Sequence, residues 1–407
     1  MEKLKTICQE TNWERIGIAA YYGYFAVNIL MKAFAYDHGD DIYQCFFIFG
    51  MIFLGIKLVT TKYSLREVAW AAVLGGVGLT LSVITKQNTW LLLFLTVIGM
   101  KNCSFRLVIK ITLYIRVFCA VVLVLGSTYG FYDMGDKTKP NVAFEEIPVY
   151  SFGLGEPNYA FLTIFIMLLL LLYYNYEKLN QWWFLGTMAV AWIFYDLTFC
   201  RTGIIVFCFC WALIIFEKLI KNEKWKVVLA YSVPVGAVLS FFLMVFYNGA
   251  NGVMARMNHY VSGRIYIMNS YYKNQGLALY PRNQEYFYAN YFGLIDNTYM
   301  FVLLYCGWAV AIFFFILVCR TLYVLYRQKR YKELVMIATM ALYAVLEQFV
   351  MNGFMNPFIL LSGILLVVTS FVLYKFRLKE SQVKMAVNAI YLLSCALAGV
   401  LMGKGLK

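Results

Sequence analysis

The sequence predicts an all-α polytopic membrane protein with about 12 to 13 transmembrane helices, and two observations support this fold class. The chain has 407 residues, of which 62% are hydrophobic and only 14% are charged, so too few charged side chains remain to cover a soluble domain. Aromatic residues make up 19% of the chain, as expected where Tyr and Trp gather at the membrane interface. We therefore expect a single transmembrane domain over residues 1–407.

A span needs about 20 mostly apolar residues, or somewhat fewer between charged flanks. Such runs cover residues 16–35, 42–60, 67–85, 89–104, 107–129, 157–175, 182–200, 202–219, 226–246, 298–319, 334–351, 357–374 and 385–402. The segment Met1 to Arg15 is polar and has no apolar region ending at a cleavage site, so we expect the first span to be a signal anchor. The 10 cysteines have no CxxC spacing, which favours packing over a metal or disulfide role.

The basic residues predict the orientation, because Lys and Arg are retained in cytoplasmic loops. With the N-terminus in the cytoplasm, the loops around Lys62, Lys101, Lys218–Lys226, Arg327–Lys332 and Lys375–Lys384 all lie on that side. The net charge of +14 therefore sets topology, and no nucleic-acid partner is expected. A thirteenth span would place Lys404 and Lys407 outside, against this rule, so the position of the C-terminus stays open.

The outer face is expected to carry a smaller loop, residues 130–157, and a large loop, residues 247–297, that covers a cavity as a lid. Most reactive side chains fall in these outer segments, while the cytoplasmic loops are short and basic. The sequence has no GxxxxGK[ST] loop and no room for a soluble nucleotide-binding domain. Energy must then come from an activated lipid-borne substrate or from a gradient.

The outer end of the sixth span reads Ser151-Phe-Gly-Leu-Gly-Glu-Pro-Asn158. Its two glycines permit a tight turn, and Pro157 suits the first turn of a helix whose free N–H groups can bind an anion. Glu156 and Asn158 are therefore candidate substrate-binding residues. The alternative is a loop-to-helix junction in which both residues serve as caps.

Arg201 lies in the short connection between two spans, near the edge of the hydrocarbon region. A charge there is costly without a partner, and a guanidinium offers a planar fork of donors suited to a diphosphate. The alternatives are an ion pair with Asp196 and snorkelling to water.

In the large loop, Ser262-Gly263 precedes Arg264, and Ile265, Met268 and Tyr272 follow at helical spacing. This pattern predicts a short interfacial helix that begins at Arg264. An arginine opposes the dipole at a helix start, so Arg264 indicates a bound anion unless it is a solvated side chain. His259 is a candidate base because of its near-neutral pKa, or else a polar loop residue.

Farther along the loop, Arg282 and a group of aromatic residues that includes Tyr288 are typical of a groove for sugar rings, or of an interfacial aromatic belt. Asp296 and Asn297 open the next span, where Asp296 is either a helix cap or a carboxylate that orients a catalytic group. Glu347 falls inside an apolar run, where a carboxylate needs an arginine partner or a polar cavity.

Together these elements resemble the Wzy-type polysaccharide polymerases, which make O-antigen and capsule, and more distantly the O-antigen ligases. The similarity rests on the order of FGLGEPNYA at 152–160, CRTG at 200–203, SGR at 262–264, DNTY at 296–299 before Gly307, and Glu347 before Asn356. Arg282 and Gly293 also have the Arg-x10-Gly spacing of some members, whereas Cys200 stands where the family has Ser.

The resemblance implies a C-type glycosyltransferase in the bacterial inner membrane, with its active site at the outer leaflet. It would move a growing glycan from undecaprenyl diphosphate to a lipid-linked repeat unit, with no cofactor or metal. Arg201, Arg264 and Arg282 would bind the diphosphate, since cations stabilise the charge of the leaving group. Glu347, Asp296 and His259 are candidate bases. Glu156, Asn158, Asn297 and Tyr288 would bind substrate, and a flippase and a chain-length regulator are expected partners.

Three alternatives remain open. An O-antigen ligase-type transferase would use the same kinds of residue. A metal-dependent transferase would use the acidic turn at Asp37–Asp41. A transporter or flippase of lipid-linked oligosaccharides would need buried charge within the spans, for which Lys32 and Arg116 are the candidates.

Overall fold

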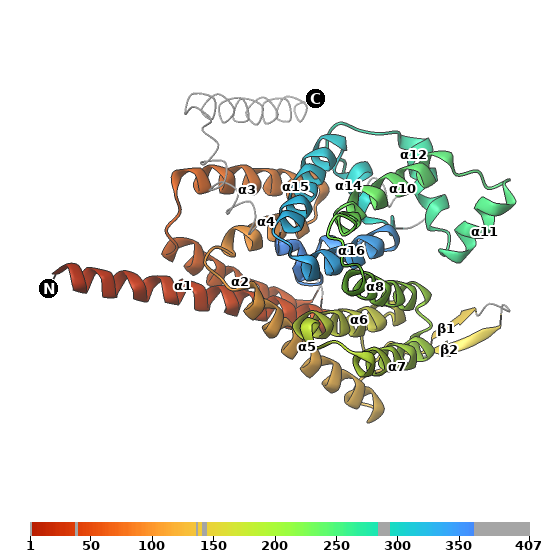
Figure 1. The fold of residues 1–407 in the computed structure, drawn as a ribbon, viewed down its shortest axis with the longest axis horizontal. Coiled ribbons are helices and arrows are strands. Elements are labelled where there is room, and N and C mark those ends of the chain that lie inside the picture. The colour runs from red at the N-terminus through yellow and green to blue at the C-terminus, as the bar shows by residue number, and fades with distance from the viewer. Residues whose placement is uncertain (1, 37–39, 136, 141–144, 284–293, 362–407) are drawn as a thin grey trace.

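The computed structural model describes residues 2–36, 40–135, 137–140, 145–283 and 294–361, and most of these are helical (Figure 1). Within this part of the chain, six helices are long and apolar enough to cross a membrane. They are α2 (Asp41–Thr60), α3 (Leu65–Thr85), α5 (Phe105–Thr128), α6 (Pro157–Tyr174), α8 (Arg201–Leu219) and α15 (Trp308–Arg327). The apolar helices α4 (Thr89–Gly99) and α10 (Ser232–Phe246) are shorter. The predicted class, an all-α membrane protein, agrees with this content.

The other helices complete the bundle and its loops. They are α1 (Glu2–Ala33), α7 (Gln181–Thr198), α9 (Val227–Ala230), α11 (Gly252–Tyr260), α12 (Arg264–Gln275), α14 (Thr298–Tyr305) and α16 (Tyr331–Leu346). Helix α6 is apolar on all sides and is the most buried of the long helices, and it packs against α5, α7 and α8. Its Phe165 ring stacks on Tyr343 of α16, with 4.8 Å between the ring centroids.

Several spans expected to be continuous are interrupted. The run 298–319 divides at Gly307 into α14 and α15, because Gly307 has φ 81°, outside helical geometry. The run 226–246 divides into α9 and α10. The run 334–351 ends as a helix at Leu346, so Glu347 lies beyond the helix and not within it. Most of the run 357–374 and the whole run 385–402 lie outside the described residues.

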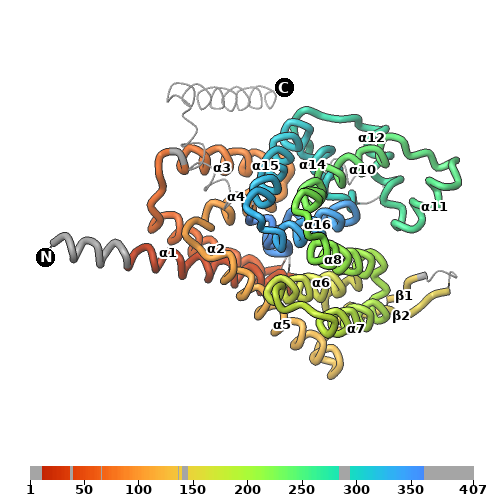
Figure 2. Tube along the Cα trace, in the orientation of Figure 1, coloured from red at the N-terminus to blue at the C-terminus, as the bar shows by residue number. Residues whose placement is uncertain are grey.

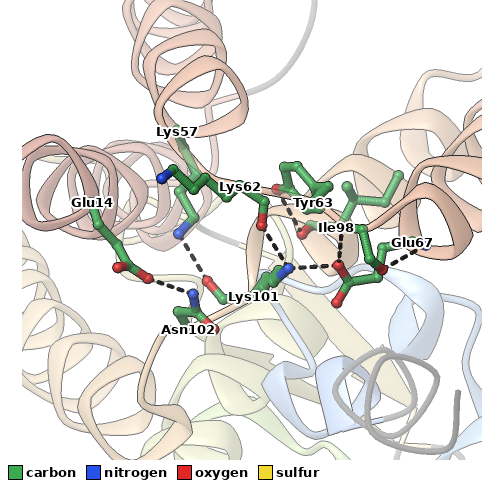
Figure 3. A network of polar contacts seen from close by, with 9 residues as sticks. Glu14, Lys57, Lys62, Tyr63, Glu67, Ile98, Lys101 and Asn102 are labelled. Atoms are coloured by element: carbon green, nitrogen blue, oxygen red, sulfur yellow. Dashed lines mark hydrogen bonds and ion pairs between the residues drawn. The ribbon is translucent and has the colours of Figure 1, made fainter. Parts of the chain in front are cut away.

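One end of the bundle is held together by the loops after α2 and α4 (Figure 3). Lys101 Nζ donates to Glu67 Oε2 at 2.6 Å and to the Lys62 carbonyl at 2.7 Å. Lys57 Nζ donates to the Lys101 carbonyl at 2.8 Å, and Asn102 Nδ2 donates to Glu14 Oε1 of α1 at 2.6 Å. Two basic loops predicted to share one face therefore contact each other.

A small β-hairpin departs from the all-α prediction. Strand β1 (Lys137–Pro140) pairs antiparallel with β2 (Glu146–Val149), with Lys139 opposite Ile147. The Tyr150 N–H donates to the Leu197 carbonyl at 2.8 Å, which ties the hairpin to the end of α7. The hairpin and α11 lie at the end of the molecule opposite the start of α1 (Figure 1, Figure 2).

Candidate functional site

Three charged side chains from different elements form an ion triad. Arg264, the first residue of α12, places Nη2 at 2.8 Å from Glu347 Oε1, just beyond α16. Its Nε lies 3.4 Å from Asp296 Oδ2, just before α14. The exposed fraction is 10% for the Arg264 side chain, 18% for Glu347 and 34% for Asp296, so the triad faces a partly open space. Of the two alternatives predicted for Glu347, an arginine partner or a polar cavity, the structure shows an arginine partner.

Local sequence explains how each member of the triad is held. Ser262 and Gly263 adopt positive φ values of 56° and 83°, and this turn lets α12 begin at Arg264. Thr298 Oγ1 donates to the Glu347 carbonyl at 2.6 Å, which fastens the start of α14 to the end of α16. The predicted helix at 264 is confirmed, and Ile265 is buried beneath it.

Asn297 has a structural role. Its Oδ1 accepts from the Met300 N–H at 2.9 Å, while its Nδ2 donates to Ser240 Oγ at 2.9 Å and to the Val345 carbonyl at 2.7 Å. The side chain is fully buried and caps α14. The alternative in which Asp296 is the helix cap is therefore wrong, because Asn297 occupies that position and Asp296 turns to Arg264.

The triad has one positive charge for two negative charges. Burial raises the pKa of Asp296 above its ordinary value, and the attraction of Arg264 offsets this only in part. Burial alone would lower the pKa of Arg264, but Glu347 and Asp296 outweigh it and raise that pKa. Arg264 is therefore charged, and its charge is compensated by the protein itself.

Two further cations, Lys139 and Arg201, act on each other electrostatically, and Lys139 is also within reach of the charge of Glu347. Lys139 of β1 donates from Nζ to Asn158 Oδ1 at 2.7 Å and to the Thr198 carbonyl at 3.1 Å. Arg201 opens α8, three residues after Thr198, and its guanidinium lies 5.6 Å from the centre of the Phe199 ring. Burial chiefly lowers the pKa of Lys139, and the nearby charge of Arg201 lowers it further, while Glu156 and Glu347 act in the opposite direction. The pKa of Lys139 therefore depends on charges from three segments of the chain, at Glu156, Arg201 and Glu347.

The structure distinguishes between the alternatives stated for Arg201, Glu156 and Asn158. Asp196 and Arg201 are both described, and they form no ion pair with each other. Glu156 forms an exposed ion pair with Lys137, and its side chain makes no cap hydrogen bond to α6. Asn158 accepts from Lys139 and lies in the site.

Other predicted residues lie apart from the triad. Arg282 donates to the Gln275 side chain and carbonyl at 3.1 and 2.9 Å, at the C-terminal end of α12. A helix rises about 1.5 Å per residue, so this end is about 16 Å from Arg264. His259 lies on the exposed helix α11 with its ring 6.3 Å from that of Tyr260. Tyr288 falls outside the described residues.

An apolar cavity of about 380 Å³ lies between α10, α14, α15 and α16. Phe241, Leu303, Phe315 and Met340 are among the side chains that line it. Thr298 also lines the cavity, and its hydroxyl donates to the main-chain carbonyl of Glu347, so one residue links the cavity wall to the backbone of the triad.

A buried cation within a span is present as well. Arg116 of α5 is completely buried, and its Nη2 donates to the Phe354 carbonyl at 2.9 Å. Its Nε and Nη1 have no hydrogen-bond partner among the described residues. Lys32 lies with Nζ 5.2 Å from the centre of the Tyr43 ring.

The described part of the chain has no group of three or more His, Cys, Asp or Glu residues arranged to hold a metal ion. Residues 37–39 of the acidic turn lie outside it. No protein-family model, curated protein or solved structure matches the chain.

Sequence reasoning missed Lys139. The signal for it was the Lys137-x-Lys139 alternation, which places two lysines on one face of a strand. The composition of that loop does not predict a strand, so the alternation alone does not indicate a site.

Proposed function

We propose that the protein is a bacterial polysaccharide polymerase, a metal-independent glycosyltransferase that moves a growing glycan from undecaprenyl diphosphate to a lipid-linked repeat unit. One observation carries the proposal: the Arg264–Glu347–Asp296 triad lies within electrostatic reach of Lys139, and Thr298 links its backbone to an apolar cavity. Fixed cations suit the charged head of such a substrate, and an apolar cavity suits its lipid chain.

In the proposed reaction, Glu347 accepts the proton of an acceptor sugar hydroxyl. The hydroxyl oxygen forms a bond to the anomeric carbon of the donor glycan, while the bond from that carbon to the diphosphate oxygen breaks. The leaving diphosphate carries away the electron pair, and cations fixed beside it stabilise the charge that develops. Asp296 and Arg264 hold Glu347 in place.

The proposed setting is the bacterial inner membrane, with the N-terminus in the cytoplasm and the site outside, under loop 247–297. Loops assigned to the outer face contact one another, as when Lys139 reaches Thr198. A flippase that supplies the lipid-linked unit and a regulator of chain length are the proposed partners.

The full chain, purified in nanodiscs and supplied with undecaprenyl-diphosphate repeat units, should produce a ladder of longer glycans on a gel. Glu347→Gln should abolish the ladder, since the amide cannot accept the proton. Glu177→Gln is the matched control, because Glu177 is an exposed carboxylate at the other end of α6. A full ladder from Glu347→Gln would contradict the assignment of the base.

A second candidate function is transport of the same lipid-linked oligosaccharides, including as a flippase. The buried Arg116 beside the irregular segment at Phe354 favours it, because transporters place buried charge and broken helices at membrane depth. The test places the protein in vesicles with a fluorescent lipid-linked sugar. Movement of the lipid between leaflets without formation of a glycan ladder would support transport over polymerisation. Transfer of a single glycan to a foreign acceptor, with no further bands on the gel, would instead indicate a ligase-type transferase.

A further inference from the structure

We propose that Lys139 and Arg201 together form the anion site that receives a diphosphate, and that Arg264 is a positioning residue for the two carboxylates. The inference rests on the proposed function and divides the three cations of the site into two roles.

The charges of the site suggest this division. Arg264 contacts two carboxylates, at 2.8 and 3.4 Å, so its charge is already compensated. The two acceptors of Lys139, Asn158 Oδ1 and the Thr198 carbonyl, are both neutral. Within the described residues, neither Lys139 nor Arg201 forms an ion pair.

The geometry brings the two cations that lack an ion-pair partner within electrostatic reach of each other. The 3.1 Å contact with the Thr198 carbonyl puts the ammonium of Lys139 at the connection between α7 and α8, and Arg201 begins α8. Like charges at close range repel, and repulsion in a partly buried site is weakly screened. A bound anion with charge on two phosphates would turn this repulsion into attraction to both groups.

The ends of two helices favour the same ligand. Helix α6 and helix α8 both begin here without a side-chain cap hydrogen bond, and Asn158, the second residue of α6, touches Lys139. N–H groups at the start of a helix and the positive end of its dipole attract negative charge. The helix starts therefore strengthen the attraction that Lys139 and Arg201 exert on an anion, and the two cations remain the main contribution.

The hairpin supplies its own control. Lys137 lies two residues before Lys139 on β1, but it forms an exposed ion pair with Glu156. Two lysines of one strand therefore differ in their surroundings: Lys137 is exposed and has a carboxylate partner, whereas Lys139 is partly buried and has two neutral acceptors.

The test measures binding of farnesyl diphosphate and inorganic pyrophosphate to the purified full chain by isothermal titration calorimetry, with farnesol as the uncharged comparison. Lys139→Met and Arg201→Ala should each weaken both diphosphates about tenfold or more, as expected for loss of a charge-assisted contact. Lys137→Met should stay within about twofold of wild type, and Lys139→Arg should retain binding. If farnesyl diphosphate binds more tightly than pyrophosphate, the ligand is a lipid headgroup. If the two bind equally, the ligand is a soluble diphosphate.

Arg264→Lys should leave diphosphate affinity and KM nearly unchanged and lower kcat, since it disturbs the carboxylates and not the anion site. Wild-type affinity in Lys139→Met, or an equal loss of affinity in Arg264→Lys, would overturn the inference. Diphosphate binding that depends on Lys139 in a protein that makes no glycan ladder would contradict the polymerase alone. A ladder that is unaffected by Lys139→Met would contradict the inference alone.

Discussion

At the scale of single residues, Arg264 carries the one positive charge of the triad, so its loss leaves two carboxylates without their ion-pair partner. It separates Glu347 from Asp296, and without it two carboxylates would face each other in a partly buried space. Since both carboxylates retain some exposure, the cost is smaller than for a fully buried pair.

We predict that Arg264→Ala lowers the free energy of unfolding by about 2 kcal/mol and reduces polymerisation about a hundredfold. The double change Arg264→Ala with Glu347→Ala should be less destabilised than the sum of the two single changes, because it removes the unpaired carboxylate. Thermal unfolding in detergent measures this coupling. Strictly additive effects would mean that the ion pair has no energetic role.

Diphosphate binding should also depend on pH through Lys139. Burial and the charge of Arg201 lower the pKa of Lys139, so its ammonium loses its proton at a lower pH than an ordinary lysine, whose pKa is about 10.4. The charged form binds the anion, so affinity is complete below this lowered pKa and falls as the pH rises through it.

The expected result is a loss of farnesyl diphosphate affinity at alkaline pH that disappears in Lys139→Arg, because arginine stays charged throughout that range. Titrations at a series of alkaline pH values, with Lys137→Met as control, measure it. The same alkaline loss in Lys139→Arg would assign the titration to another group.

The sequence indicated Arg201, Arg264, Asp296 and Glu347 by their chemistry, since charges near apolar runs need partners. It could not say which partner each has, because contacts such as Arg264 to Glu347 join residues 83 positions apart. The sequence did not indicate Lys139, because the face of the hairpin on which its side chain lies depends on strand pairing, and the composition of the loop does not predict strands.

At the scale of elements, hydropathy predicted where the chain is apolar and not where its helices end. The run 298–319 stays apolar across Gly307, yet the helix breaks there. The break is fixed by partners from the large loop: the Trp308 N–H donates to the Ala278 carbonyl at 2.9 Å, and the Arg282 N–H donates to the Tyr305 carbonyl at 2.8 Å. These contacts depend on tertiary structure, so no local pattern reveals them.

We predict that Gly307→Ala destabilises the protein by about 2 kcal/mol or more. A Cβ at this position would meet the Leu279 carbonyl oxygen at 2.6 Å, and φ 81° is unfavourable for alanine. Gly75→Ala in α3 is the control, since a Cβ there meets nothing within 4 Å and alanine favours a helix. Thermal unfolding should separate the two variants, and equal stability would contradict the strain at Gly307.

At the scale of the whole molecule, the predicted membrane class follows from composition, while the site depends on how the bundle is assembled. The polar network at Lys101 joins the loops after α2 and α4, while elsewhere the hairpin contacts the end of α7 and α12 contacts the segment beyond α16. The apolar cavity between α10, α14, α15 and α16 includes Thr298, which donates to the main-chain carbonyl of Glu347, and in the proposed function this cavity takes the lipid chain of the substrate. Hydropathy alone does not predict these long-range contacts.

The most direct measurement is a structure of the Glu347→Gln variant with a bound undecaprenyl-diphosphate repeat unit. We predict that the diphosphate lies within hydrogen-bond distance of Lys139 and Arg201, with the lipid chain toward the apolar cavity and a sugar hydroxyl beside residue 347. A diphosphate bound at the basic loops around Lys101, or beside Arg116 within the span, would contradict it.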